Sequence, residues 1–178
     1  MVERFFSVSV PQNQSQLQPQ PVMLLSGPPS CGKTSLLFQF AFNAALEDTH
    51  FSNGNVVFIC NRRRSCQERY GNPRGRELAM IRTLALCHNA ITHANETRPC
   101  KLLLSDTHHG DSPRLLFIYK RWVSTVFTIK GDGSGSFILK SNNNIGNGSS
   151  ERTNSKTAKY SIALQYLFLE GITEDCEM

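Results

Sequence analysis

The chain has 178 residues, of which 39% are hydrophobic, a length and composition that fit one globular domain and exclude a wholly disordered protein. No apolar run approaches the roughly 20 residues needed to cross a bilayer, which excludes an integral membrane protein. Residues 1–10 do not have the pattern of a secretory signal peptide. The six cysteines form no CxxC pair and follow no regular spacing, so we expect reduced thiols in a nuclear or cytosolic protein.

The positive charge of the chain is concentrated in one segment. Nineteen lysines and arginines against 14 aspartates and glutamates give a net charge of +5. Seven arginines and two glutamates between residues 62 and 82 carry the same net charge of +5. A local basic cluster favours a polyanionic partner.

The first part of the chain predicts a flexible arm followed by a βαβ unit. We expect the arm over residues 1–21, because residues 11–21 alternate glutamine with proline and other polar residues. The apolar runs over 22–25 and 56–60 are typical of strands that are buried on both faces. A helix over Ser35–Leu46 lies between them, so the two strands are expected to be parallel with a right-handed connection.

The rest of the chain predicts further α/β structure and a C-terminal β-hairpin. We expect one domain over residues 22–140, a flexible loop over 141–157, and a terminal element with an acidic tail over 158–178. The period of Tyr160–Leu169 fits a strand as well as a helix. The other expected elements are a helix over Gly75–His93, a strand over Lys101–Ser105, and a hairpin of strands 122–129 and 137–139 around a turn at 131–135.

One motif carries specific chemistry. The segment from Gly27 to Thr34 matches GxxxxGK[ST] in full, with a predicted buried strand before it and a predicted helix after it. This context predicts a nucleotide-binding P-loop for ATP and Mg²⁺. The alternative is a Gly/Pro turn that matches by chance. The nucleotide-binding residues predicted here are Gly27, Pro28, Pro29, Ser30, Cys31, Gly32, Lys33, Thr34 and Ser35.

Each residue type in the motif has a physical reason. Gly27 and Gly32 permit the backbone angles that turn N–H groups inward, towards an anion. Lys33 reaches the β- and γ-phosphates as a flexible point charge, and the Thr34 hydroxyl is placed to bind Mg²⁺. We expect Cys31 to be a small space-filling residue rather than a reactive thiol.

Hydrolysis needs a carboxylate for Mg²⁺ and a base that orients water, in addition to the P-loop. Asp106 follows an apolar run, so it is a candidate Mg²⁺ ligand and a candidate catalytic residue beside Lys33. His108, His109 and Asp111 are nearby candidates for polarising water or completing a metal site. The alternative is a polar loop at the end of a strand that lines the nucleotide site without catalysing a reaction.

A resemblance extends beyond the motif. Its most specific segments are LLSGPPSCGKTSLLFQFAFNAALE and VVFICNRRRS, and it covers roughly residues 22–170. On these segments, the chain resembles the small RecA-like ATPase subunit, in its plant form, that partners a SWIM-domain zinc protein in Shu-type recombination complexes. The resemblance implies a RecA-like fold, binding of ATP and single-stranded DNA, a SWIM-domain partner in a hetero-oligomer, and a nuclear role in homologous repair of double-strand breaks.

The chain departs from the family pattern after its second predicted strand. A RecA-like core has a Walker B strand that ends in Asp before the next long helix, whereas here Asn61 and the arginines lead directly into that helix. Parallel strands need a connection of about a dozen residues, so the interval is too short for the missing strand. The resemblance therefore makes the strand before Asp106 the nucleotide-sensing strand, and it implies a reduced core that hydrolyses ATP poorly.

Three arginines are candidates for contacts with DNA. Arg62, Arg63 and Arg64 follow the second predicted strand, at the edge of an α/β sheet where ligands gather. They are candidates to bind the phosphates of single-stranded DNA. The alternative is a solvated loop that doubles as a nuclear-import patch.

The resulting prediction is an ATP-binding accessory factor in recombinational repair. Two other classes stay open: a small P-loop kinase of a nucleotide or metabolite, and a pseudo-ATPase interaction module. A kinase needs an arginine-rich lid, and the segment between Asp106 and the predicted hairpin offers only Arg114 and Arg121.

Overall fold

The computed structural model describes residues 2–6, 22–47, 72–97, 99–107, 116–143, 155–164 and 166–175. The predicted strand over 56–60 and residues 11–21 of the predicted arm lie outside these ranges. The described elements are the 3-10 helix η1 (Val2–Phe5), β1 (Val22–Gly27), α1 (Lys33–Glu47), α3 (Pro73–Asn95), β2 (Leu102–Thr107), α4 (Leu116–Lys120), β3 (Thr125–Gly131), β4 (Ser136–Asn143), β5 (Ser155–Ala163) and β6 (Tyr166–Asp175).

The described strands form one mixed sheet of six strands in the order β2-β1-β3-β4-β5-β6. β1 pairs in parallel with β2 on one side and with β3 on the other. From β3 onwards, every neighbouring pair is antiparallel. The prediction of the α/β class is therefore confirmed, and the strand that leads into the motif has a parallel neighbour on both sides.

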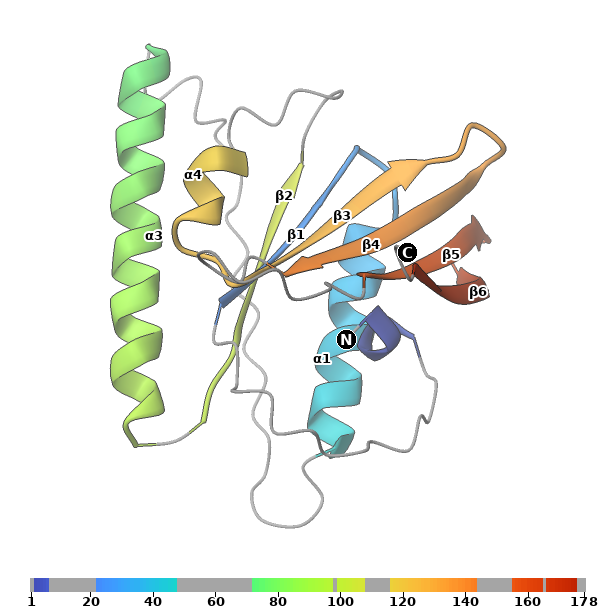
Figure 1. Ribbon diagram of the computed structural model, residues 1–178, viewed down its shortest axis with the longest axis horizontal. Helices are drawn as coiled ribbons and strands as arrows, with labels where there is room; N and C mark the ends of the chain where they lie inside the picture. The colour runs from blue at the N-terminus through green and yellow to red at the C-terminus, as the bar shows by residue number, and fades with distance from the viewer. Residues whose placement is uncertain are drawn as a thin grey trace.

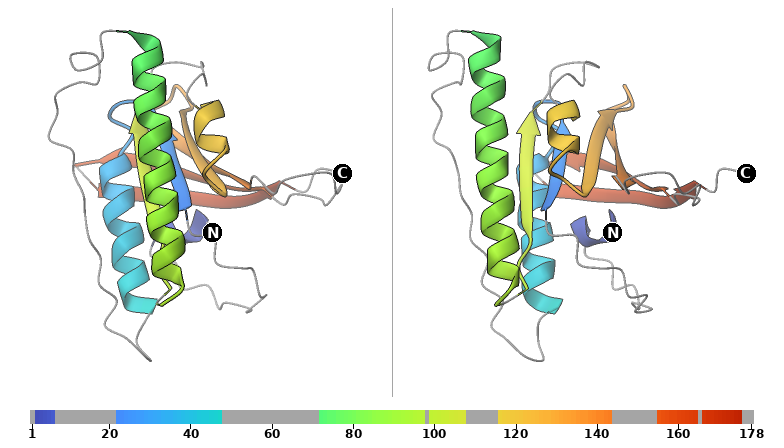
Figure 2. Two further views of the ribbon diagram at one scale, coloured as in Figure 1. Left: turned by 90° about the vertical axis from the view of Figure 1, so that its left-hand side faces the viewer. Right: turned by 60° about the vertical axis from the view of Figure 1, so that its left-hand side comes forward.

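Helices lie on both faces of this sheet (Figures 1 and 2). Successive residues of β1 point to opposite faces, so the strand contributes to two clusters. Met23 and Leu25 pack in one cluster with Leu36 of α1, while Leu24 packs in the other, where Ile91 of α3 contributes. All six residues of β1 are buried, which confirms the prediction of a strand buried on both faces.

The N-terminal helix η1 is part of the core. Val2 and Phe5 are fully buried, and the Phe5 ring lies 5.0 Å from the ring of Phe40 and 4.9 Å from that of Phe127, between centroids. The prediction of a flexible arm is therefore wrong for residues 2–6. The polar composition that predicted the arm belongs to residues 11–21. In residues 2–6, by contrast, burial of large aromatic side chains holds the segment in place.

Helix α3 begins where its capping residues predict. The Asn72 side chain accepts a hydrogen bond from the Gly75 amide, and proline is tolerated in the first turn because its missing N–H has no helical partner there. The predicted helix is confirmed, but only part of its predicted apolar face is buried. Leu84 is 5% exposed, whereas Leu78, six residues earlier, is 55% exposed.

The C-terminal region consists of strands. The predicted hairpin is confirmed as β3 and β4, and the segment that fitted a strand or a helix forms β5 and β6, with Leu164 in the turn at φ +49°. The predicted loop over 141–157 is too long at both ends, because β4 continues to Asn143 and β5 begins at Ser155. Ladder hydrogen bonds are made by the backbone, so polar residues extend both strands without an apolar pattern.

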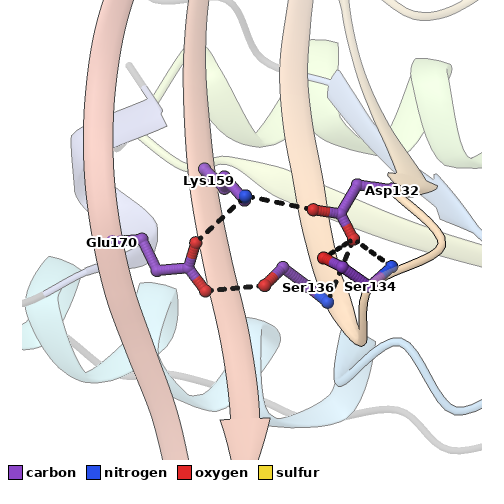
Figure 3. Close-up of polar contacts among 5 residues, drawn as sticks. All are labelled: Asp132, Ser134, Ser136, Lys159 and Glu170. Carbon is purple, nitrogen blue, oxygen red and sulfur yellow. Dashed lines mark hydrogen bonds and ion pairs between the residues drawn. The ribbon is translucent and has the colours of Figure 1, made fainter.

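A polar network ties together the three C-terminal strands (Figure 3). The Asp132 carboxylate accepts hydrogen bonds from the amide and hydroxyl of Ser134, at 2.9 and 2.7 Å, and these bonds hold its pKa below the usual range. Lys159 of β5 lies 3.1 Å from Asp132 and 3.4 Å from Glu170 of β6. Ser136 of β4 donates to Glu170 at 2.7 Å. These contacts fix the positions of β4, β5 and β6 relative to one another.

The pairing of Glu3 with Lys156 makes stability depend on pH. Their charged atoms are 2.7 Å apart. Burial opposes ionisation of Glu3, but the hydrogen bond from Lys156 and other favourable contacts outweigh it and lower the pKa of Glu3 from 4.5 to about 2. The contribution of this carboxylate is therefore present above about pH 4.5 and is lost as the pH falls towards 2.

Replacing Glu3 by glutamine is expected to lower the free energy of unfolding at pH 7 by the order of 1–3 kcal/mol. The difference from the wild type should shrink as the pH falls from 4.5 towards 2. Urea unfolding at a series of pH values measures it, and Glu96→Gln, a change at an exposed carboxylate, is the control. A difference that stays constant down to pH 2 would contradict the assignment.

Candidate functional site

The predicted P-loop connects the C-terminal end of β1 to the start of α1. Gly27 is the last residue of β1, Lys33 is the first residue of α1, and the Gly32 carbonyl accepts the helical hydrogen bond from the Leu36 amide at 2.9 Å. The strand–loop–helix context predicted from the motif is confirmed. Ser30 and Gly32 have φ angles of +59° and +75°, so the loop turns through the left-handed region twice.

Gly27 allows the loop to approach β3 closely. A Cβ atom on Gly27 would lie 2.8 Å from Ile129 Cβ and 2.9 Å from Cys31 Sγ. Both distances are shorter than the non-bonded contacts that Cβ atoms make in proteins. A side chain at this position would push the loop away from β3. The first glycine of the motif is thus required here by packing.

Cys31 is a buried part of the apolar core. Its side chain is fully buried, in the cluster that also contains Met23 and Leu36. Burial raises the pKa of the Cys31 thiol, while the nearby Lys33 acts in the opposite direction. The space-filling role predicted for Cys31 agrees with this position.

Lys33 is held over the loop by the loop's own backbone. Its ammonium donates hydrogen bonds to the Gly27 carbonyl at 2.9 Å and to the Pro28 carbonyl at 2.5 Å, and it lies 3.6 Å from Cys31 Sγ. A lysine ammonium has three donors and no acceptor, so these contacts orient it at the mouth of the loop. Phosphate oxygens would replace neutral carbonyls with charged acceptors, which form stronger hydrogen bonds.

The rim of the loop is accessible to a ligand. Pro29 and Ser30 are exposed on the loop, and Thr34 and Ser35 are exposed in the first turn of α1. That first turn contains no acidic residue, so no carboxylate there opposes the positive end of the helix dipole. The arrangement suits an anion such as a phosphate group.

Asp106 lies beside the loop in the sheet. In the parallel pairing of β1 with β2, Asp106 is opposite Ser26 and Thr107 is opposite Gly27. Asp106 therefore lies at the C-terminal end of the strand next to β1, and its residue is half-buried. His108, His109 and Asp111 lie outside the described residues, and within the described ranges no three His, Cys, Asp or Glu residues gather as a metal site.

The predicted DNA contacts are in a part of the chain outside the described residues. Arg62, Arg63 and Arg64 fall in the gap between residues 47 and 72. Their role stays a prediction from the sequence.

Sequence reasoning did not find the residues of β5 and β6 that support the loop on the same face of the sheet as α1. The hydroxyl of Tyr160, in β5, donates a hydrogen bond to the Cys31 carbonyl at 2.7 Å. A Cβ atom on Gly32 would lie 2.9 Å from Ile162 Cδ1 and 3.1 Å from Leu167 Cδ2. These contacts join positions about 130 residues apart, and no local pattern in the sequence predicts them.

The comparisons with known proteins provide no family. No protein-family model matches the sequence, and no curated protein sequence matches it. No helix within the described ranges is long and apolar enough to span a membrane.

Replacing Gly27 by alanine is expected to destabilise the fold by about 1–3 kcal/mol, because the new methyl group would collide with Ile129 and Cys31. Gly131→Ala is the matched control: it also ends a strand, and its Cβ would meet nothing closer than Phe137 at 4.0 Å. Urea unfolding of both variants measures the difference. Equal stability of the two variants would contradict the packing role of Gly27.

Proposed function

We propose that this chain binds ATP with Mg²⁺ through residues 27–35 and acts as a RecA-like accessory factor in homologous-recombination repair. Its partners in this role are single-stranded DNA and a SWIM-domain zinc protein, in a nuclear hetero-oligomer. The observation that carries the ATP-binding part is the position of Lys33, whose ammonium lies at the mouth of a glycine-rich loop between a buried strand and a helix N-terminus.

The loop residues divide the work of holding a nucleotide. Backbone N–H groups of the loop and of the first turn of α1 bind phosphate oxygens, and Lys33 neutralises their charge. The Thr34 hydroxyl, exposed at the same helix end, holds Mg²⁺. When bound, ATP and Mg²⁺ supply the charge that the loop recognises and a state that a partner protein can sense.

ATP hydrolysis is not part of the proposed activity. Asp106 is in the strand next to β1, opposite Ser26, where a carboxylate can line the nucleotide site. The family resemblance assigns this strand to the sensing of the nucleotide and leaves the Walker B aspartate out of the chain. Binding without efficient turnover suits an accessory factor that works through its partners.

The DNA-repair part of the proposal rests on the resemblance and on charge. The arginine-rich segment from 62 to 82 carries a charge equal to the net charge of the whole chain, so a polyanion is the expected macromolecular partner. The kinase alternative gains no support from Arg121, which lies against the Trp122 ring, 5.8 Å from its centroid, rather than in a lid.

The same contacts of Lys33 fit a second function. Its bonds to the Gly27 and Pro28 carbonyls are equally compatible with a pseudo-ATPase in which the loop has only a structural role. The two functions differ in whether phosphate oxygens displace these carbonyls, and binding measurements separate them.

Replacing Lys33 by alanine is expected to weaken binding of a fluorescent ATP analogue about 10- to 100-fold, because charge-assisted hydrogen bonds contribute about 1.5–3 kcal/mol each. Fluorescence titration of the purified chain with Mg²⁺ measures the affinity, and Lys130→Ala, a change at an exposed lysine of β3, is the control. A wild-type chain that binds no ATP, or a Lys33 variant that binds it equally well, would support the pseudo-ATPase.

The same titration with a single-stranded oligonucleotide tests the repair role. The affinity for DNA is expected to fall steeply as salt increases, because bound arginines release counterions. If the chain binds ATP but binds no oligonucleotide at any salt concentration, the proposed nucleotide site is supported and the proposed role in DNA repair is contradicted.

Asp106→Asn is expected to leave the rate of phosphate release within about twofold of the wild type, with both rates near the background of the assay. The reason is that the proposal gives Asp106 no role in holding Mg²⁺ for hydrolysis. Phosphate release with and without single-stranded DNA provides the measurement. Clear turnover by the wild type that disappears in the variant would instead make Asp106 the Mg²⁺ ligand of an active ATPase.

A further inference from the structure

A buried tyrosine from β5, three strands away from β1 in the sheet, reaches the middle of the predicted P-loop. Tyr160 is in β5, and β3 and β4 separate β5 from β1 in the sheet order. The side chain is fully buried, and its hydroxyl donates to the Cys31 carbonyl at 2.7 Å across 129 positions of sequence. A polar atom in this apolar core requires a partner, and the loop provides it.

The tyrosine ring is held in place by its neighbours. Phe137 stacks on it with a centroid separation of 5.6 Å, and the Phe6 ring is tilted against it at 5.7 Å. Burial raises the pKa of Tyr160 above the usual range for a phenol, so the protonated hydroxyl is the donor of this bond. The hydrogen bond therefore has a fixed donor.

The bond also orients the next amide of the loop. In a planar trans peptide the C=O and N–H groups point in opposite directions. With the Cys31 oxygen directed at Tyr160, the N–H of Gly32 must be directed away from the phenol. This N–H is at the start of α1, where backbone donors have no partner within the helix and anions bind.

The loop needs such a constraint because its own backbone is permissive. Gly32 has a φ of +75°, and glycine populates many other conformations at little cost. Ile162 and Leu167 close the space beside Gly32, but apolar contacts alone do not select the direction of a peptide group. A single hydrogen bond to the Cys31 carbonyl does select it.

We propose that Tyr160 is a positioning residue for nucleotide binding: its hydroxyl fixes the Cys31–Gly32 peptide so that the Gly32 amide faces the phosphates. This inference rests on the proposed ATP binding. It adds a residue to the site that the P-loop motif does not contain. The benefit is preorganisation, since an amide that already points at the ligand does not have to be ordered on binding.

Tyr160→Phe tests the proposal, because it removes the hydroxyl and keeps the ring. The variant is expected to bind the fluorescent ATP analogue about three- to tenfold more weakly, the range that one neutral hydrogen bond provides. Inorganic triphosphate should lose affinity by the same factor, since the Gly32 amide meets phosphate. A loss limited to ATP, or no loss, would overturn the proposal.

Phe137→Leu is the matched control, because it disturbs the packing of the same ring and leaves the hydroxyl. It is expected to reduce stability while its affinity for ATP stays near that of the wild type. Equal losses of affinity in the two variants would show a merely structural role for Tyr160 and overturn the proposal. Binding is compared at a temperature at which circular dichroism shows both variants folded.

The Gly32 amide resonance gives a readout that needs no nucleotide. In ¹⁵N-labelled protein this resonance is expected to shift or broaden in Tyr160→Phe and to stay near its wild-type position in Phe137→Leu. An unchanged Gly32 resonance in Tyr160→Phe overturns the positioning role whatever the binding data show. If the wild type binds no ATP but the resonance responds, the proposed function fails and the control of this peptide by Tyr160 is supported.

Discussion

The burial of β1 on both faces is the constraint on which the rest of the structure depends. Because alternate side chains of this strand pack against α1 on one face and against α3 on the other, the strand has one possible position and register. The position of β1 therefore determines where the loop after its C-terminal end begins. Gly27 then brings the loop into contact with β3, and Lys33 begins the helix that covers the strand. A P-loop needs this rigidity, since its ligand is held by backbone groups.

The site combines a polar rim with an apolar floor. On the rim, the Lys33 ammonium bonds to the loop's own carbonyls, and Thr34 is exposed. On the floor, the Cys31 side chain packs among core residues while its carbonyl meets Tyr160. A loop built this way is supported by the same hydrophobic clusters that stabilise the domain. A substitution in the core is therefore expected to change both the stability of the fold and the geometry of the loop. The role of a residue in the loop is best tested with a variant that changes the geometry of the loop without changing the stability of the fold.

The sequence predicted the parts of the fold that depend on neighbouring residues. Strand β1, helix α1 and the P-loop between them follow from a short apolar run, a motif and an apolar periodicity, all within 26 residues that the structure describes without a gap, 22–47. The burial of Phe5 and the contact of Tyr160 with Cys31 had no such signal, because both depend on partners that only the folded sheet brings near. The polar residues at the end of β4 and at the start of β5 resembled a loop for the same reason: their pairing with β3 and β6, rather than their composition, makes them strands.

The parallel pairing of β1 has a consequence for the order in which the molecule is assembled. Val22 pairs with Leu102, and Met23 pairs with Thr125, whereas the antiparallel pairs of the C-terminal half join residues close in sequence. Distant pairings form slowly, because a long chain segment must be closed before they yield any stabilisation. During synthesis on the ribosome, β1 emerges before β2 and β3, the two strands with which it pairs. The loop after β1 therefore gains its contact with Tyr160 only after β5 has been synthesised.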